Sequence, residues 1–163
     1  EKREEVTTEG GLDLGQQGKL EALREALHRL KEVGVRTSLF IDPDLGSLRV
    51  SAELGAEAVE LHTGEYANAR GDAKGRELAR LFAATREGLD LGLAVHAGHG
   101  LTYENVTPVA AIPGIEELNI GHSIISRSLF VGLERAVKEM MDLIRQAPIM
   151  VDEPGIWVPP IGF

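Results

Sequence analysis

The chain has 163 residues, of which 43% are hydrophobic and 26% are charged, a composition typical of globular proteins. Its formal net charge is −9, and no Lys- and Arg-rich run with interleaved aromatic residues provides a basic face, so we expect no nucleic-acid partner. No run approaches about 18 apolar residues and no secretory leader is visible, so we expect neither a membrane span nor secretion. The absence of Cys excludes disulfides and thiolate chemistry and fits a cytoplasmic protein.

Apolar periodicity predicts helices and strands that alternate along the chain. Four strand–helix units of this kind predict an α/β protein with a parallel sheet and right-handed connections. In chain order, we expect a helix over 19–33, a strand over 35–41, a short helix ending at 54, a strand over 58–62, a helix over 74–89, a strand over 91–96, a short helix over 106–112, a strand over 118–122 and a helix over 127–145.

The predicted helices carry signals for their ends and for their buried faces. Asp42 is expected to cap the short helix, with Pro43 in its first turn. The first helix is expected to bury a stripe made of Leu20, Leu23, Leu27, Leu30 and Val33. The last helix is expected to bury a stripe made of Phe130, Leu133, Val137, Met140, Met141 and Ile144.

The composition changes near the C-terminal end, which divides the chain into residues 1–146 and a tail over 147–163. The tail contains four of the seven prolines and the single Trp, so it cannot form a regular helix. We expect it to dock on the body through Ile156, Trp157 and Phe163; a disordered tail and a subunit contact are the alternatives.

Four of the five histidines lie within three residues of the end of a predicted strand. The carboxyl ends of parallel strands form the active face of α/β proteins, and of barrels in particular. The fifth, His28, is on the first helix and is interpreted as a solvated side chain. The four histidines at strand ends are His62, His96, His99 and His122.

Two glycine-rich turns have the character of phosphate sites. One covers residues 98–100 after the third strand, and the other covers residues 121–123 after the fourth, and each contains a His. Small residues let the backbone approach an anion, and the N–H groups at a helix start can donate to it. A simple turn without a ligand is the alternative interpretation.

Glu60 lies in an otherwise apolar strand, and alternation places it on the same face as His62. It is either a salt-bridged structural carboxylate or a group that stabilises charge and handles protons near a substrate. His96 and His99 form an H-x-x-H pair that could ligate a metal together with Glu60 or His62, which would make the protein a metal-dependent barrel hydrolase.

Five motifs of the chain are Glu1 to Asp13, Ser38 to Asp42, Glu60 to Gly64, Ala97 to Tyr103 and Glu117 to Ile125. In this order and spacing they resemble pyridoxine 5′-phosphate synthase, and the resemblance extends to about Gln146. The resemblance implies a parallel (β/α)8 TIM barrel that works as a homo-oligomer in the bacterial cytoplasm. It implies condensation of 3-amino-2-oxopropyl phosphate with 1-deoxy-D-xylulose 5-phosphate to pyridoxine 5′-phosphate, phosphate and water, without a metal or redox cofactor.

The same resemblance assigns roles to residues of this chain. His99 corresponds to the proton donor, and Glu60 to the carboxylate that stabilises charged intermediates. His96 departs from the family pattern, in which Asn is common at this position. The residues that correspond to substrate contacts are Thr7, for the deoxyxylulose phosphate, and Gly100, Gly121 and His122, for the aminoketone phosphate.

Only about four of the eight barrel strands have a counterpart in this chain. The first four strands, which carry a catalytic His-x-Arg segment and a general-base Glu in the family, are missing. We therefore expect turnover to need a complementary N-terminal half of the barrel, because four units leave two open sheet edges and an uncovered lumen face. The alternative of another class is a non-catalytic phosphate-binding barrel fragment.

Overall fold

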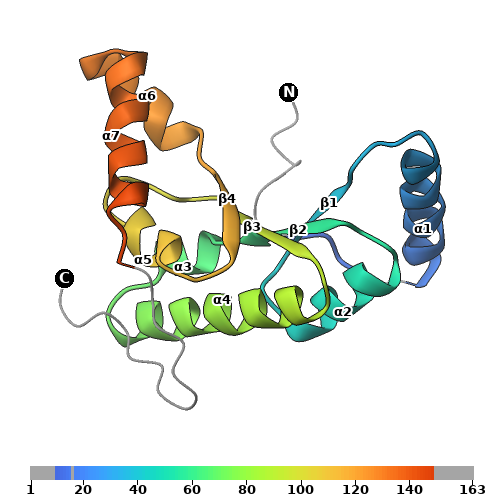
Figure 1. The fold of residues 1–163 in the computed structure, drawn as a ribbon. Coiled ribbons are helices and arrows are strands. Elements are labelled where there is room, and N and C mark those ends of the chain that lie inside the picture. Colours follow the sequence, from blue (N-terminus) through green and yellow to red (C-terminus); the bar gives the residue numbers. More distant parts are fainter. Residues whose placement is uncertain (1–9, 16, 149–163) are drawn as a thin grey trace, which may run out of the picture.

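The computed structural model of the chain describes residues 10–15 and 17–148 (Figure 1). Helices and strands alternate along most of the described chain, as the apolar periodicity predicts. The elements, in chain order, are α1 (Gln17–Glu32), β1 (Ser38–Ile41), α2 (Leu45–Glu53), β2 (Ala58–His62), α3 (Gly64–Asn68), α4 (Asp72–Asp90), β3 (Ala94–Gly98), α5 (Val106–Ala110), β4 (Ile115–Asn119), α6 (His122–Val131) and α7 (Leu133–Arg145).

The four strands form one parallel sheet in the order β1-β2-β3-β4, so each strand pairs with its neighbour in the sequence. This arrangement confirms the α/β class and corresponds to four consecutive βα units of a (β/α)8 barrel. Register aligns Phe40 with Glu60, Glu60 with His96, and His96 with Glu117. Because strand side chains alternate between faces, this row places a carboxylate and an imidazole side by side on one face.

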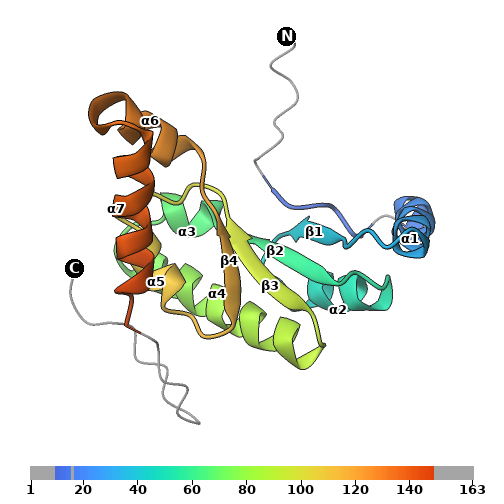
Figure 2. The ribbon, with the colours of Figure 1, turned by 45° about the horizontal axis from the view of Figure 1, so that its top comes forward.

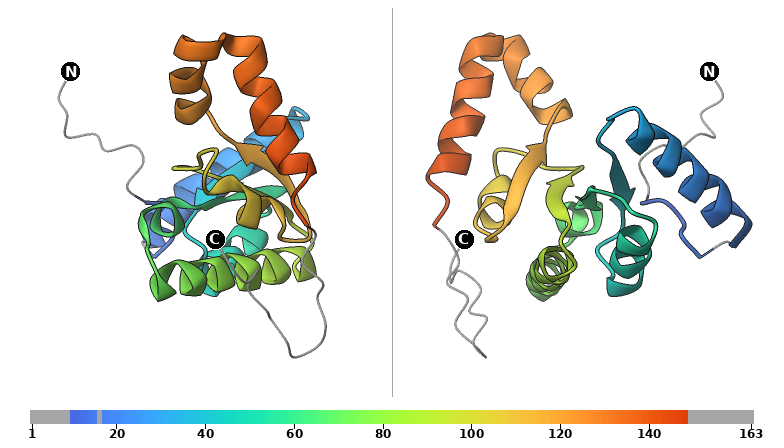
Figure 3. Two further views of the ribbon diagram at one scale, coloured as in Figure 1. Left: turned by 90° about the vertical axis from the view of Figure 1, so that its left-hand side faces the viewer. Right: turned by 45° about the vertical axis from the view of Figure 1, so that its right-hand side comes forward.

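Helices α2 and α4 lie on the same side of the sheet, with α1 beyond β1 and the α6–α7 hairpin beyond β4 (Figures 2 and 3). No described helix packs on the middle of the opposite face in these views, which is the face that a complete barrel would turn toward its lumen. The core lies between the sheet and the two helices. Its fully buried side chains include Ile41, Leu48, Val59, Leu61, Leu81, Ala84 and Val95.

The third and fourth strands lie three residues away from their predicted starts. Strand β3 begins at Ala94 because residues 91–93 finish the preceding helix: Leu91 is the C-cap of α4, and Gly92 has a φ of +78°. Strand β4 begins at Ile115, where two exposed glutamates interrupt the apolar pattern of this edge strand. The predicted strand over 118–122 was therefore wrong at its C-terminal end, because His122 is the first residue of α6.

The predicted single helix over 127–145 was also wrong, because the structure has two helices that meet at Gly132. Gly132 has a φ of +83°, which turns the chain between α6 and α7. Most of the stripe that was expected to be buried is exposed: Phe130 is 85% exposed and Leu133 is 56% exposed, whereas Met140 is 1% exposed. Periodicity correctly indicated an amphipathic helix, but most of its apolar face has no partner in the described chain.

Three smaller expectations also need correction. Leu27 is buried on α1, whereas Leu30 and Val33 of the same predicted stripe are exposed. Asp42 does not cap α2: the N-cap is Asp44, whose carboxylate accepts the Ser47 N–H at 2.9 Å. Pro43 therefore precedes the helix instead of lying in its first turn.

No described helix is long and apolar enough to cross a membrane. The predicted docking of the tail through Ile156, Trp157 and Phe163 concerns residues outside the described ranges.

Candidate active site

A cavity of about 410 Å³ lies at the carboxyl ends of the strands, and its size is ordinary for a small-molecule site. It brings together five of the six residues that the sequence predicted for the site: Glu60, His99, Gly100, Gly121 and His122. The sixth, Thr7, lies outside the described residues. The cavity is also lined by Ser123, which belongs to the predicted turn over 121–123, and by four residues to which sequence reasoning gave no role: Leu101, Thr102, Asn119 and Ile120.

Glu60 projects from β2 into this cavity and is half-buried. Gly98 leaves room for it, because a Cβ at Gly98 would collide with Glu60 Oε1 and lie 2.9 Å from Asn119 Cβ. Burial raises the pKa of Glu60, while the neighbouring His96 and a hydrogen bond from the Asn119 side chain pull it back down. The site therefore holds a carboxyl group that can exchange a proton closer to neutrality than an exposed Glu.

His99 follows β3 directly and has a φ of 88°, the only positive φ among the described non-glycine residues. This left-handed conformation is unfavourable for a residue with a Cβ, and such strain is typical of functional positions. Burial lowers the pKa of His99, and the nearby His62 lowers it further. Its imidazole can therefore lose a proton more readily than an exposed histidine.

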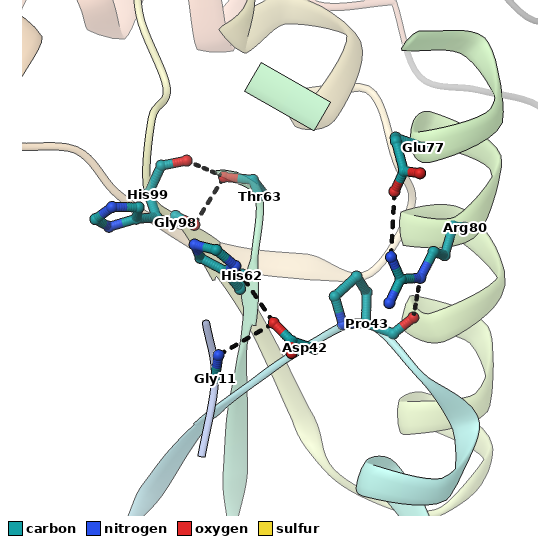
Figure 4. A network of polar contacts seen from close by, with 9 residues as sticks. All are labelled: Gly11, Asp42, Pro43, His62, Thr63, Glu77, Arg80, Gly98 and His99. Atoms are coloured by element: carbon teal, nitrogen blue, oxygen red, sulfur yellow. Dashed lines mark hydrogen bonds and ion pairs between the residues drawn. The ribbon is translucent and has the colours of Figure 1, made fainter. Parts of the chain in front are cut away.

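The backbone around His99 is held by the first residue after β2. The buried Thr63 hydroxyl lies 2.7 Å from the Gly98 carbonyl oxygen and 2.6 Å from the His99 carbonyl oxygen, and it donates its single proton between them (Figure 4). The Thr63 N–H also donates to the Gly98 carbonyl at 2.8 Å. These bonds fasten the strained turn to the neighbouring strand.

The loop after His99 is fixed by the side chain of Asn105. Its amide donates to the Gly100 carbonyl at 3.1 Å, and its oxygen accepts the Thr102 N–H at 2.7 Å. The buried Tyr66 hydroxyl donates to the Asn105 carbonyl at 2.9 Å. Burial raises the pKa of Tyr66 to about 12, so this hydroxyl stays a donor. One wall of the cavity is thus a loop held by three hydrogen bonds, and Gly100 of this loop lines the cavity.

The opposite wall is the start of α6. Gly121 is the N-cap, and the first bond within the helix runs from the Ile125 N–H to the Gly121 carbonyl at 3.0 Å. The N–H groups of residues 122–124 therefore have no acceptor within the helix and can donate to an anion. The Ser123 hydroxyl donates to the Leu101 carbonyl at 2.9 Å, which joins this wall to the loop after His99.

The other residues that the sequence singled out have different places. His62 is buried beside the cavity, His96 lies within β3, and His28 is exposed on α1, 3.4 Å from Glu32. No three His, Asp or Glu side chains in residues 10–15 and 17–148 are placed to hold a metal ion. The geometry thus gives no support to the metal-dependent hydrolase that the H-x-x-H pair suggested.

Sequence reasoning missed residues that can be placed at the site only when the ends and the pairing register of the strands are known. Asn119 is the last residue of β4, and it would have been a candidate if that strand had been placed correctly, since it then falls at a carboxyl end. Thr63 directly follows β2, but an isolated Thr after a strand gives no signal of its bond to the next strand.

Comparison with known proteins is consistent with this arrangement. Residues 1–146 match the family described as "Pyridoxal phosphate biosynthesis protein PdxJ". The chain is 54% identical to pyridoxine 5'-phosphate synthase of Trichlorobacter lovleyi over 147 residues, which are 90% of this chain and 61% of the relative. It is 57% identical over 141 residues to the Synechocystis sp. protein of the same name, covering 86% of this chain and 57% of the relative.

A third relative, the pyridoxine 5'-phosphate synthase of Geobacter sulfurreducens, is 51% identical over 148 residues, which are 90% of this chain and 61% of that protein. The chain thus spans about three fifths of the length of these curated relatives. Since the family match extends over most of its residues, the chain belongs to the pyridoxal phosphate biosynthesis protein PdxJ family.

Proposed function

We propose that this chain supplies the Glu60 and His99 side of the reaction chamber of a pyridoxine 5′-phosphate synthase. The reaction joins 3-amino-2-oxopropyl phosphate to 1-deoxy-D-xylulose 5-phosphate and gives pyridoxine 5′-phosphate, phosphate and water. The observation that carries the proposal is the cavity at the strand ends, where the carboxylate, the imidazole and the start of α6 meet.

The proposed phosphate contacts follow from the two walls of the cavity. Gly100, Gly121 and His122 hold the phosphate of the aminoketone, because the glycines allow close approach and the first turn of α6 offers free N–H donors. Thr7 contacts the phosphate of the deoxyxylulose substrate. The charge of −9 opposes the binding of anions, so these local donors must provide the attraction.

The proposed chemistry uses the two titratable groups in the cavity. Condensation of an amine with a ketone, loss of water and ring closure all need protons to be moved repeatedly. His99 donates protons to the departing oxygen atoms and takes them up again, because an imidazole gains and loses a proton near neutral pH. Its lowered pKa makes the protonated ring a stronger acid. Glu60 faces the same space and stabilises the iminium cation that forms when the amine condenses with the carbonyl.

We propose that the whole barrel, rather than this chain alone, converts the substrates. The resemblance assigns a His-x-Arg segment and a general-base Glu to strands outside this chain, and about two fifths of the length of each relative lies outside the match. A complementary N-terminal half closes the sheet edges at β1 and β4. We also propose, from the same family membership, a homo-oligomer in the cytoplasm.

The test is to supply both substrates to the chain, to an N-terminal half taken from a relative, and to the two together, and to measure pyridoxine 5′-phosphate. Product is expected only from the mixture, and the His99→Ala variant of this chain should abolish it. The matched control is His28→Ala, an exposed His on α1 that should leave turnover unchanged. Phosphate binding without product in a soluble, associated mixture would refute the synthase and favour the non-catalytic fragment.

A further inference from the structure

Three side chains stand in a row at the ends of three neighbouring strands. Asp42 follows β1, His62 ends β2 and His99 follows β3. The Nδ1 atom of His62 lies 3.3 Å from Asp42 Oδ1, and the rings of His62 and His99 are 5.1 Å apart with a tilt of 38° (Figure 4). Only His99 of the three lines the cavity, so the other two stand behind it.

The residues packed around the His62 ring hold it in one orientation. It is 5% exposed, and Phe40 meets it edge-on with the ring centroids 5.2 Å apart. It also packs over Gly64, where a Cβ would lie 2.6 Å from His62 Nε2. That Nε2 atom is buried with no hydrogen-bond partner in the described chain, so the Nδ1 side and Asp42 alone fix the ring through a polar contact.

Asp42 is held through its carboxylate and through the backbone of the residue that follows it. Its carboxylate accepts the Gly11 N–H at 3.1 Å, where no larger residue fits because a Cβ would collide with the backbone of Ile41 and Asp42. On the other side, Arg80 of α4 donates to the carbonyl of Pro43 at 3.1 Å (Figure 4). The Asp42 side chain is 47% exposed, but these contacts fix its carboxylate beside the His62 ring.

We propose that Asp42 and His62 are positioning residues for His99, with the Asp42 carboxylate fixing the His62 ring and that ring supporting the His99 imidazole at the cavity. The proposal rests on the proposed function only in that His99 is taken to move protons. The titratable groups around His62 are Asp42 after β1, Glu60 on β2 and His99 after β3. Since His62 also lowers the pKa of His99, its removal should alter the pH profile as well as the geometry.

The kinetic test compares two carboxylates that are two residues apart. The protein tested joins this chain to the remaining barrel strands of a relative. In it, Asp42→Asn should reduce kcat by about 10- to 100-fold, because the proton donor His99 is no longer held in its reactive position. The KM should change by less than about twofold. Asp44→Asn is the control: Asn caps helices as well as Asp does, and Asp44 contacts Ser47 rather than His62. Equal kcat values for the two variants would overturn the proposal.

Two further measurements separate positioning from folding and from the proposed function. His62→Phe keeps a ring against Phe40, and its combination with Asp42→Asn should cost no more than the larger single effect, since the two residues act as a unit; additive losses would refute the coupling. ¹⁵N NMR of the unaltered 163-residue chain needs no substrate: in the neutral form of His62 the single ring proton should be on Nδ1, and the neutral tautomer with its proton on Nε2 would overturn the proposal whatever the activity.

Discussion

Thr63→Val tests how the strained turn at His99 is held. The substitution keeps the shape of the side chain but removes the hydroxyl that lies between two carbonyl oxygens. The Gly98 carbonyl still accepts the Thr63 N–H at 2.8 Å, whereas the His99 carbonyl loses its donor at 2.6 Å. Leaving one partly buried carbonyl without this bond should lower the free energy of unfolding by about 1 to 2 kcal/mol.

Thr85→Val provides a matched control. Thr85 is as buried as Thr63, and its hydroxyl also donates to a carbonyl, that of Leu81 at 2.8 Å. The Leu81 carbonyl lies four residues back in α4 and keeps the N–H of residue 85 after the substitution. The control should therefore cost less than about 0.5 kcal/mol, since Val and Thr have similar helix propensities.

Thermal unfolding followed by circular dichroism measures both variants. For a chain of this length, 1 kcal/mol corresponds to roughly 2 to 4 °C, so Thr63→Val should lower Tm by roughly 2 to 8 °C and Thr85→Val by less than about 2 °C. Equal shifts, or a larger shift for Thr85→Val, would refute the idea that the Thr63 hydroxyl stabilises the strained turn.

Four other outcomes follow from the same geometry. His99→Gly should be more stable than His99→Ala by about 1 kcal/mol in urea unfolding, because only Gly accepts the φ of 88° without strain; equal stabilities would contradict this. Because burial raises the folded-state pKa of Glu60, the contribution of this group to stability is full below its unfolded pKa and falls as pH rises through the folded value. Glu60→Gln should remove this decrease when the free energy of unfolding is measured as a function of pH. A variant with the pH profile of the wild type would contradict the raised pKa of Glu60. In a barrel completed with the strands of a relative, Gly98→Ala should weaken substrate binding and turnover together, because the new Cβ displaces the Glu60 carboxylate. Wild-type KM and kcat would show that the carboxylate is not confined there. Phe130→Ser should change the free energy of unfolding by less than about 0.5 kcal/mol because Phe130 is exposed, whereas Met140→Ala should lower it by about 2 to 5 kcal/mol because Met140 is buried. A larger effect of Phe130→Ser would show that Phe130, and not Met140, is buried.

The parts of the fold that could be predicted from sequence are those set by local pattern. Strand β2 has the bounds that its apolar run predicts, because both ends are marked by glycines and polar residues. The position of Glu60 and His99 at one cavity followed from a general rule, that parallel strands present their carboxyl ends at a common edge. Local pattern and this rule together predicted that these side chains gather at one edge of the sheet, and the structure places both beside the same cavity.

The parts that could not be predicted depend on contacts between distant segments. Asp42 has the local sequence of a helix cap, and only the placement of β1 beside β2 shows that it faces His62. Strand β4 has two adjacent exposed glutamates, which break the alternating apolar pattern by which strands are recognised. The stripe of α7 predicts an apolar face, but periodicity does not say whether another segment covers it.

The backbone of His99 also bears on how related sequences diverge. A residue with a Cβ at a φ of 88° is kept there against its own conformational preference, so stability alone would favour its replacement by Gly. A gene copy that no longer needs the imidazole gains stability from that single change, whereas a copy under selection for the chemistry cannot accept it. We therefore expect the amino acid at this one position to separate related chains that keep the proposed His99 chemistry from those that have lost it.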